Sequence, residues 1–383
     1  MLKQLSFATL VAHLALSALA QIQLPPGSGT PPPVREWVQA IDMTKIPAAP
    51  IQPPIDQNRQ CEKAKGFCNW SCDNCINKQT DFDSCPKGTW AVTFDDGPTQ
   101  FTPPLLDFLA KQKIKATFFV MGQNVRDHGP FLKRAFQEGH EIASHTWSHS
   151  ALTSLTNEQI VAEMKWTEIA IEQVIGVKPK YMRPPYGDID DRVRGILTSM
   201  GYKAVIWNHD SNDWRIKEGQ STPAAVDGNF TQWIKEAATA QVGGLSLEHD
   251  HAEITVQLAI KNLPLLAKAY KLIPLSQCVG DANVYQAGPV VNNTSSVVPL
   301  PSSATAPSMP SMVAAPAVNS SAPAVVSMAV PVSQLLPPDA KNLNPSGSQT
   351  GNAAQSTPAK SSASKTMNLG AAMGAILLAL TML

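Results

Sequence analysis

Two adjacent carboxylates, Asp95 and Asp96, directly follow a run of apolar, β-prone residues at 90–94 and precede the turn-forming pair Gly97-Pro98. Because two neighbouring carboxylates cannot share one environment, one can bind a metal ion while the other accepts a proton. The stretch therefore predicts a metal-assisted acid–base site at the carboxyl end of a strand. Taken alone, it is more typical of a turn with two solvated aspartates.

Two histidines, His145 and His149, lie four residues apart. That spacing places both imidazoles on one face if the segment forms a helical turn. Two histidines and one carboxylate, with further coordination positions left open, are typical of a catalytic zinc site, and we expect Asp96 to be the third ligand. Surface histidines on a helix are the alternative for this pair considered alone.

The elements that must position these residues lie between about residue 88 and residue 273, where short apolar strands alternate with amphipathic helices. Strands are expected at 90–94, 116–121, 141–144, 181–183, 203–207, 245–248 and 272–273. One helix should begin at the capping box of Thr156 and end at Gly176, and another should span 190–200.

Repeated strand–helix units predict a parallel α/β sheet, and we expect a barrel rather than a doubly wound sheet. In a barrel of this kind, function is carried by residues just past the carboxyl ends of the strands. Here those residues are Asp95, Asp96, His145, His149, Arg183, Asp213 and His249.

The two ends of the chain differ in composition from this region. Residues 1–20 combine a basic start, an apolar stretch and a small-residue ending, which predicts a cleaved secretory signal. Residues 367–383 favour a removed GPI-anchor signal over a membrane span, for which about 18 apolar residues and a basic flank are expected. The expected attachment sites are Ser361, Ser362 and Asn352.

Four further parts are expected between these ends: a disordered Pro-rich leader at 21–60, a Cys-rich collar at 61–85, a catalytic domain at 86–279 and a Ser/Ala/Pro-rich stalk at 280–366. Six cysteines in a secreted chain predict disulfides. The net charge of zero gives no electrostatic reason to expect nucleic acid. Sequons predict N-glycosylation at Asn69, Asn229, Asn293 and Asn319.

Five ordered motifs make the sequence resemble the polysaccharide deacetylases, carbohydrate esterase family 4. The motifs are TFDDGP at 93–98, SHTWSH at 144–149, RPPYG at 183–187, DSNDW at 210–214 and LEH at 247–249. The resemblance covers about half of the chain and implies a distorted, partly open (β/α) barrel. The secreted, anchored architecture is similar to that of fungal chitin deacetylases, which implies hydrolysis of the N-acetyl groups of chitin to give chitosan and acetate.

The resemblance also implies the chemical role of each motif residue. Asp96, His145 and His149 would bind one divalent metal, with zinc expected and cobalt or another divalent ion as the alternative. Asp95 would be the general base that activates water, and His249 would be the general acid that protonates the departing sugar nitrogen.

Other motif residues would support this chemistry. By the same resemblance, Arg183 would position the base, and Asp213 would hold and charge the acid. The backbone N–H of Tyr186 would contact the oxyanion, and Trp214 and Leu247 would line a pocket for the acetyl methyl group.

The resemblance implies a disulfide between Cys85 and Cys278, with the other four cysteines paired within the collar. His251, which neighbours the last motif, is interpreted as scaffold. The expected partners are chitin or chitooligosaccharides, the cell wall and, through a GPI anchor, the plasma membrane; we expect a monomer.

Three alternatives to chitin deacetylation remain at the level of the sequence. The first is the same chemistry on peptidoglycan or acetylated xylan. The second is a carbohydrate-binding wall protein with an inactive site, and the third is a structural mannoprotein of the wall.

Overall fold

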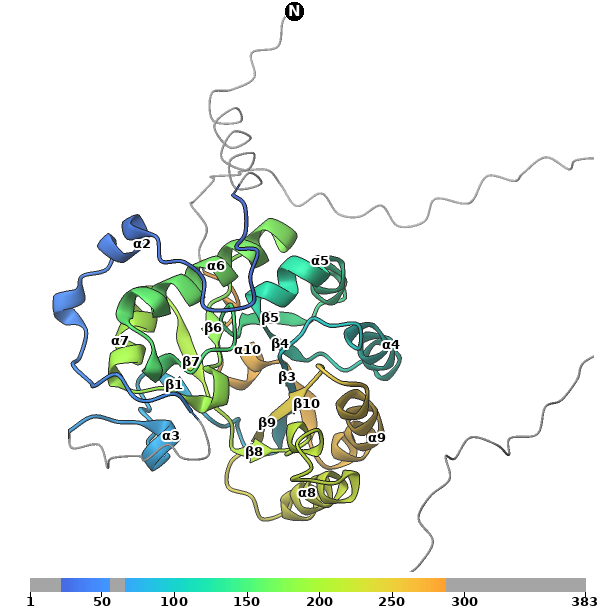
Figure 1. Ribbon diagram of the computed structural model, residues 1–383. Helices are drawn as coiled ribbons and strands as arrows, with labels where there is room; N and C mark the ends of the chain where they lie inside the picture. The colour runs from blue at the N-terminus through green and yellow to red at the C-terminus, as the bar shows by residue number, and fades with distance from the viewer. Residues whose placement is uncertain (1–21, 56–65, 287–383) are drawn as a thin grey trace, which may run out of the picture. The chain divides into compact units, whose positions relative to one another are not determined.

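The computed structural model describes residues 22–55 and 66–286 (Figure 1). The predicted signal and anchor segments lie outside the described residues, as do most of the stalk, Cys61, Asn293, Asn319, Asn352, Ser361 and Ser362. Within the described ranges, no helix has the length and apolar character needed to cross a membrane.

A ten-stranded parallel sheet forms the centre of the domain (Figure 1). Its order is β1-β7-β6-β5-β4-β3-β9-β2-β10, with β8 paired to β9. The end strands β1 and β10 are not paired with each other within the described part of the chain, so the barrel is open, as expected. The strands are β1 Asp81–Phe82, β2 Thr89–Ala91, β3 Thr93–Asp95, β4 Thr117–Val120, β5 Glu141–Ser144, β6 Tyr181–Met182, β7 Lys203–Val205, β8 His209–Asp210, β9 Gly244–His249 and β10 Lys271–Ile273.

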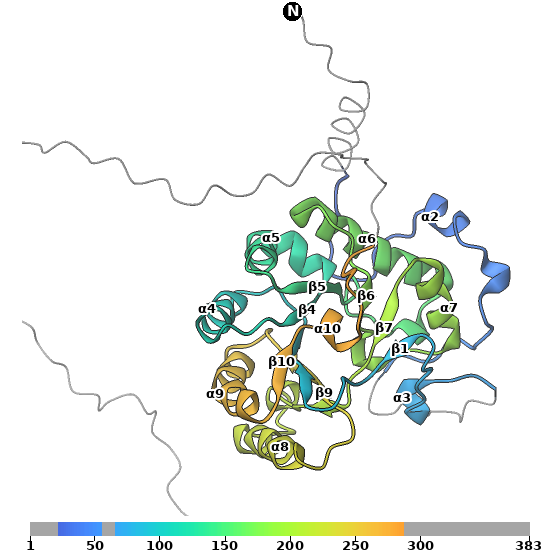
Figure 2. The same cartoon turned by 180° about the vertical axis from the view of Figure 1, so that it is seen from behind.

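Helices surround the outside of the strands, while α10 lies at the middle of the ring of strands (Figures 1 and 2). The helices are α2 Arg35–Gln39, α3 Trp70–Asp73, α4 Thr102–Gln112, α5 Gly122–Gln137, α6 Asn157–Ile175, α7 Asp191–Ser199, α8 Pro223–Glu236, α9 Glu253–Ala269 and α10 Leu275–Cys278, with 3-10 turns at Met43–Lys45, Leu152–Ser154, Pro185–Gly187 and Trp214–Ile216. The predicted capping box at Thr156 and the left-handed Gly176 bound α6.

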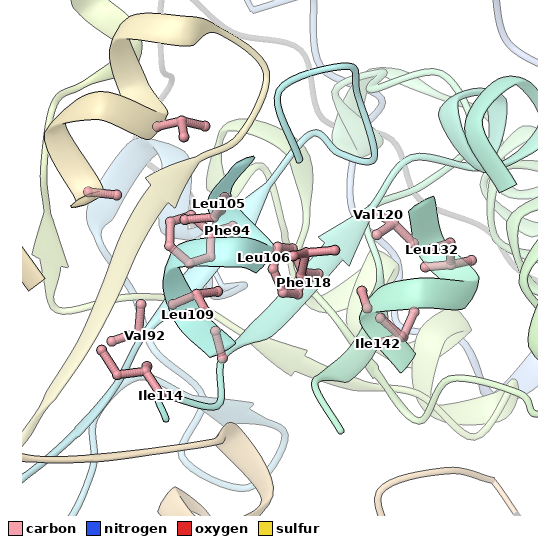
Figure 3. Packing of buried hydrophobic residues seen from close by; sticks show 14 of the residues in the cluster. Val92, Phe94, Leu105, Leu106, Leu109, Ile114, Phe118, Val120, Leu132 and Ile142 are labelled. Carbon is pink, nitrogen blue, oxygen red and sulfur yellow. The ribbon is translucent and has the colours of Figure 1, made fainter. Parts of the chain in front are cut away.

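The outer face of the sheet packs against these helices. Phe94 and Phe118 stack with their ring centroids 5.4 Å apart and meet Leu105 and Leu109 of α4 (Figure 3). All four side chains are at most 2% exposed. Parallel strands that are buried on both faces consist of nearly continuous apolar residues, so they can be recognised as apolar runs in the sequence.

The inner face of the sheet carries a second set of buried residues, among them Phe119, Tyr181 and Leu245, and Leu275 of α10 packs against them. A disulfide joins Cys85, before β2, to Cys278 at the end of α10, with a Cα–Cα distance of 4.9 Å. This is the pairing that the family resemblance implied, and it links the two ends of the barrel.

Residues 90–94, expected as one strand, form parts of two. β2 pairs with β10 and β9, whereas β3 pairs with β9 and β4. Strand propensity is continuous through the segment, and the division arises from long-range pairing that a local pattern does not contain.

The leader was expected to be disordered, and this is wrong for residues 22–55. Trp37 packs edge-on against Trp166 with ring centroids 5.0 Å apart, and the Trp166 indole N–H donates to the carbonyl of Pro32 at 3.0 Å. Arg126 donates to the carbonyl of Pro25 at 2.6 Å. Proline fixes an extended backbone, so single apolar residues can dock on the domain without any sequence period.

The expected domain boundaries at 86 and 279 also need correction. β1 lies within the collar but pairs with β7, so the collar contributes to the main sheet. Beyond α10, Asp281 binds Lys180 at 2.5 Å and the Gln286 N–H donates to the Lys178 carbonyl at 3.0 Å. The compact domain therefore includes residues on both sides of the predicted range.

Candidate metal and acid–base site

One pocket, with a volume of about 930 Å³, collects most of the predicted site residues at the carboxyl ends of the strands. Its lining includes Asp95, Asp96, His145, His149, Tyr186, Trp214, Leu247 and His249. The remaining two, Arg183 and Asp213, do not line the pocket but contact Asp95 and His249 from the protein interior.

The two adjacent aspartates have different surroundings. Asp95 ends β3 and is 2% exposed, and Asp96 has a φ of 76°, in the left-handed region that non-glycine residues seldom adopt. The turn separates the two carboxylates. Asp95 Oδ1 accepts from Arg183 at 2.8 Å, whereas Asp96 Oδ1 lies 3.4 Å from His145 Nε2 and 3.3 Å from His149 Nε2.

His145 and His149 meet on a bent loop rather than on the helical turn that their spacing suggested. Thr146 and His149 have φ values of 65° and 61°, which bring the two imidazoles to a centroid distance of 5.0 Å. His145 Nδ1 lies 2.8 Å from the Arg183 carbonyl, so an Nδ1–H donor there leaves the Nε2 lone pair facing Asp96.

These three residues fit a divalent metal. One ligand atom from each lies within 4.8 Å of the others, and the buried Asp96 Oδ1 has no hydrogen-bond partner among the described residues. Burial lowers the pKa of His149 to about 4, which keeps its imidazole neutral. Burial opposes ionisation of Asp96, but the neighbouring His149, His145 and His251 hold its pKa well below the usual range. An anionic carboxylate and two imidazoles form a donor set suited to transition metals.

Arg183 holds the carboxylate of Asp95 from the protein interior. It is fully buried, and its Nη1 donates to Thr93 Oγ1 at 2.6 Å as well as to Asp95. Its guanidinium lies 4.3 Å from the centre of the Phe119 ring. Only Asp95 Oδ1 is engaged by the arginine, which leaves Oδ2 available to the pocket.

His249 forms a separate pair with Asp213. The imidazole Nδ1 is 2.7 Å from Asp213 Oδ1, and the backbone N–H of His249 donates to Oδ2 at 2.9 Å. Burial acts against the imidazolium, but the charge of Asp213 and its hydrogen bond prevail and raise the pKa of His249 to about 10. His249 is therefore a cation at neutral pH and can give up a proton.

Two residues near the site escaped the sequence reasoning. His251, interpreted as scaffold, lines the pocket with Nδ1 3.3 Å from Asp96 Oδ2. Its position two residues after His249, past the end of β9, was an available signal. Glu163 of α6 accepts from the backbone N–H groups of Trp147 and Ser148 at 2.7 and 2.9 Å, and no local sequence signal connects it to that loop.

Two of the glycosylation sequons fall within the described residues. The structure argues against Asn69, which is 1% exposed and whose Oδ1 accepts from Ser71 Oγ at 2.9 Å and from the Cys72 N–H at 3.2 Å. Asn229 is half-buried on α8, and its amide donates to the Ser211 carbonyl at 2.9 Å. Asn229 stays a predicted site.

The fold is an open barrel of parallel strands. Its loops bring together an Asp/His/His cluster, an aspartate bound by an arginine and a histidine bound by an aspartate. This combination of fold and site defines a class of proteins. The chain belongs to the polysaccharide deacetylase family, whose model matches residues 83–205.

Relatives extend this match beyond the family model. Over 286 residues the chain is 40% identical to Chitin deacetylase 1 of Cryptococcus neoformans var. grubii, covering 70% of this chain and 61% of that protein. It is 38% identical to Chitin deacetylase 2 of Saccharomyces cerevisiae over 242 residues, covering 63% of this chain and 72% of the relative. The chain spans about three fifths of the first curated relatives, 61% and 62% of their lengths.

A solved structure is similar as well. The chitin deacetylase from the fungal pathogen Colletotrichum lindemuthianum aligns with a TM-score of 0.51 and 30% identity, covering 57% of this chain and 100% of that one. This likeness confirms the fold class.

Proposed function

We propose that this protein hydrolyses the N-acetyl groups of N-acetylglucosamine units in chitin, giving chitosan and acetate. The observation that carries the proposal is the convergence, in one pocket, of Asp95, of His249 as a cation and of the Asp96/His145/His149 cluster. Relatives named chitin deacetylase support chitin over peptidoglycan or xylan as the substrate.

Asp96, His145 and His149 would hold one divalent cation, for which zinc is the first candidate and cobalt an alternative. When bound, such a cation supplies Lewis acidity, which acidifies water and polarises an acyl carbonyl.

Asp95 acts as the general base. Asp95 lines the pocket, and its Oδ2, which Arg183 does not engage, takes the proton of the water that attacks the acetamide carbon. Arg183 keeps the carboxylate in place through Oδ1. The exposed Tyr186, whose φ is 60°, belongs to the turn at the pocket mouth, and its backbone N–H is the proposed donor to the oxyanion.

His249 acts as the general acid. The carbon–nitrogen bond breaks as the imidazolium gives its proton to the sugar nitrogen, so that a neutral amine leaves instead of an amide anion. Asp213 maintains the imidazolium and its orientation through Nδ1. Trp214 and Leu247 line the pocket and are the proposed contacts of the acetyl methyl group.

The proposal includes a place of action. Disulfides in the described chain support secretion. We further propose a monomer that is attached to the plasma membrane or cell wall by a GPI anchor, and that is glycosylated at Asn229.

The test is acetate release from chitooligosaccharides by the purified chain, before and after removal of metal with a chelator and again after zinc is restored. We expect activity that disappears with the metal and returns with zinc. A folded, zinc-loaded chain that releases no acetate from chitooligosaccharides would contradict the proposal. Parallel assays on peptidoglycan fragments and acetylated xylan report the substrate class.

A further inference from the structure

We propose that the Cys-rich collar supplies a sugar-binding subsite, in which Trp70 packs against the N-acetylglucosamine unit next to the one being deacetylated. The inference rests on the proposed function, because it takes a polymer of this sugar as the substrate. The collar residues 66–80 precede the match to the family model, which begins at residue 83. Their helix α3 lies beside β1 (Figures 1 and 2).

The collar is fixed firmly to the domain. A disulfide between Cys68 and Cys75 closes the segment that contains α3, with a Cα–Cα distance of 5.3 Å. The hydrogen bonds that fasten it to residues 188–194 are Trp70 N–H to Ile189 O at 3.0 Å, Cys68 N–H to Asp191 Oδ2 at 2.8 Å, Ser71 Oγ–H to Asp188 Oδ1 at 2.7 Å, Arg194 Nη1 to Cys68 O at 2.7 Å and Arg194 Nη2 to Cys75 O at 3.1 Å. A surface held in this way loses little entropy when a ligand binds.

Trp70 forms part of the pocket wall. Its ring meets the edge of Trp207 with centroids 4.7 Å apart. It also packs directly on the turn that carries Tyr186, because a Cβ at Gly187 would come within 2.1 Å of the indole. Trp70 and Ser71 line the same pocket as the metal cluster, so the collar and the reacting centre share one surface.

The chemistry of this wall suits a β-linked hexopyranose. Such a sugar presents C–H groups on the faces of its ring and hydroxyls around its edge, and the half-buried indole of Trp70 offers apolar area for such a face. Tyr186, which is 52% exposed, and Trp214 add further aromatic surface.

The dimensions of the pocket favour a ligand longer than one sugar. Its volume of about 930 Å³ is near the upper end of the range of roughly 300–1,000 Å³ for pockets that hold drug-sized ligands. When one unit of a polymer places its acetamide at Asp95, its neighbours must lie along the same pocket, whose wall includes Trp70.

The experiment compares Trp70→Ala and Trp70→Phe with the unchanged chain, using a tetramer of N-acetylglucosamine and the small ester 4-nitrophenyl acetate. For Trp70→Ala we expect the KM for the tetramer to rise roughly tenfold, the usual cost of truncating a binding tryptophan. Any loss of hydrolysis of the small ester, which does not reach a neighbouring sugar subsite, should be much smaller than the loss on the tetramer, and Trp70→Phe should restore most of the tetramer affinity. Trp37→Ala is the matched control, because this tryptophan also lies N-terminal to the barrel but packs on Trp166 and does not line the pocket.

Calorimetric binding of the tetramer to the metal-free chain separates this inference from the proposed function. The metal-loaded chain could fail to deacetylate the tetramer while the metal-free chain binds it and Trp70→Ala binds it roughly tenfold more weakly. That result would support the sugar-binding subsite and contradict the proposed activity. Equal tetramer binding and KM in Trp70→Ala and the unchanged chain would overturn the subsite. A similar loss of turnover on the tetramer and the small ester would also overturn it, because Trp70 would then act only by supporting the turn of Tyr186.

Discussion

Asp95 and Asp96 are neighbours in the chain, yet the left-handed backbone of Asp96 gives their carboxylates different partners. One meets a buried arginine and the other meets two imidazoles. The same chemical group can therefore serve two functions at adjacent positions, and matched substitutions can separate them.

Asp95→Asn and Asp96→Asn make the same small change one residue apart. We expect Asp95→Asn to keep its metal and to lose roughly 10²–10⁴-fold in kcat, because a general base typically contributes that much. Asp96→Asn should lose metal affinity as well. Metal content and acetate release, measured on both variants, check the assignment. Substantial turnover in Asp95→Asn would show that another group is the base.

The charge of Asp213 should set the alkaline limit of activity. Because the pKa of His249 is raised to about 10, the imidazolium is present at neutral pH and is lost as the pH rises through that value. Asp213→Asn removes the charge that raises this pKa, so the fall in kcat should move to lower pH by at least about one unit. A pH profile of kcat with the same alkaline limb in both proteins would exclude His249 as the acid.

The side chains of the candidate site could be named from the sequence, because each chemical group follows a strand or belongs to a compact motif. The sequence did not predict the conformation that joins them. The left-handed φ values of Asp96, Thr146 and His149 have no local sequence signal, and the histidine loop is held by the distant Glu163. The role of His251 depends on its approach to Asp96.

At the scale of elements, α6 supports the histidine loop. Glu163 lies inside the helix, is fully buried and accepts both backbone N–H groups that follow Thr146. Ser148 Oγ donates to its other oxygen at 2.5 Å. Although these hydrogen bonds act to lower the pKa of Glu163, burial has the larger effect and raises it. The helix thus presents one acceptor group to a loop that has no regular secondary structure.

We expect Glu163→Ala to lower the free energy of unfolding by about 2–4 kcal/mol, because several donors lose their buried acceptor. Metal affinity should fall roughly 10–100-fold, since His149 would no longer be held in place. Glu168→Ala is the control: Glu168 is also buried on α6 but binds Lys165 and Tyr202, so stability should fall while metal affinity stays unchanged. Unchanged metal affinity in Glu163→Ala would contradict the supporting role.

Element types were readable from sequence wherever periodicity and caps were strong, as in α6. The two-residue strands β1 and β8 were not, because so short a segment becomes a strand only through the partner it meets. The leader shows no hydrophobic periodicity. It packs on the domain through single apolar residues that lie between prolines in the sequence.

At the scale of the whole molecule, the described residues on both sides of the predicted catalytic domain pack on the barrel. The collar gives a strand to the sheet, the leader covers part of the helical layer, and the Cys85–Cys278 disulfide joins residues 193 positions apart. A cross-link across so many residues restricts the unfolded chain far more than a short one does.

Replacing both Cys85 and Cys278 with serine should therefore lower the free energy of unfolding by about 4–5 kcal/mol. The control is the double serine variant at Cys68 and Cys75, which are only seven positions apart, and its loss should be about 2 kcal/mol. Denaturant unfolding of the three proteins provides the comparison. A larger loss for the short loop would show that local packing, not chain restriction, dominates.

The same disulfide has a mechanical consequence. Cys85 and Cys278 stand 4.9 Å apart at their Cα atoms, and strands β2 to β10 all lie between them in the chain. A tension applied across these two cysteines passes directly through the sulfur–sulfur bond. The strands that carry Asp95, His145 and His249 lie outside this load path, so their geometry is shielded from a pull across the two cysteines for as long as the bond is oxidised.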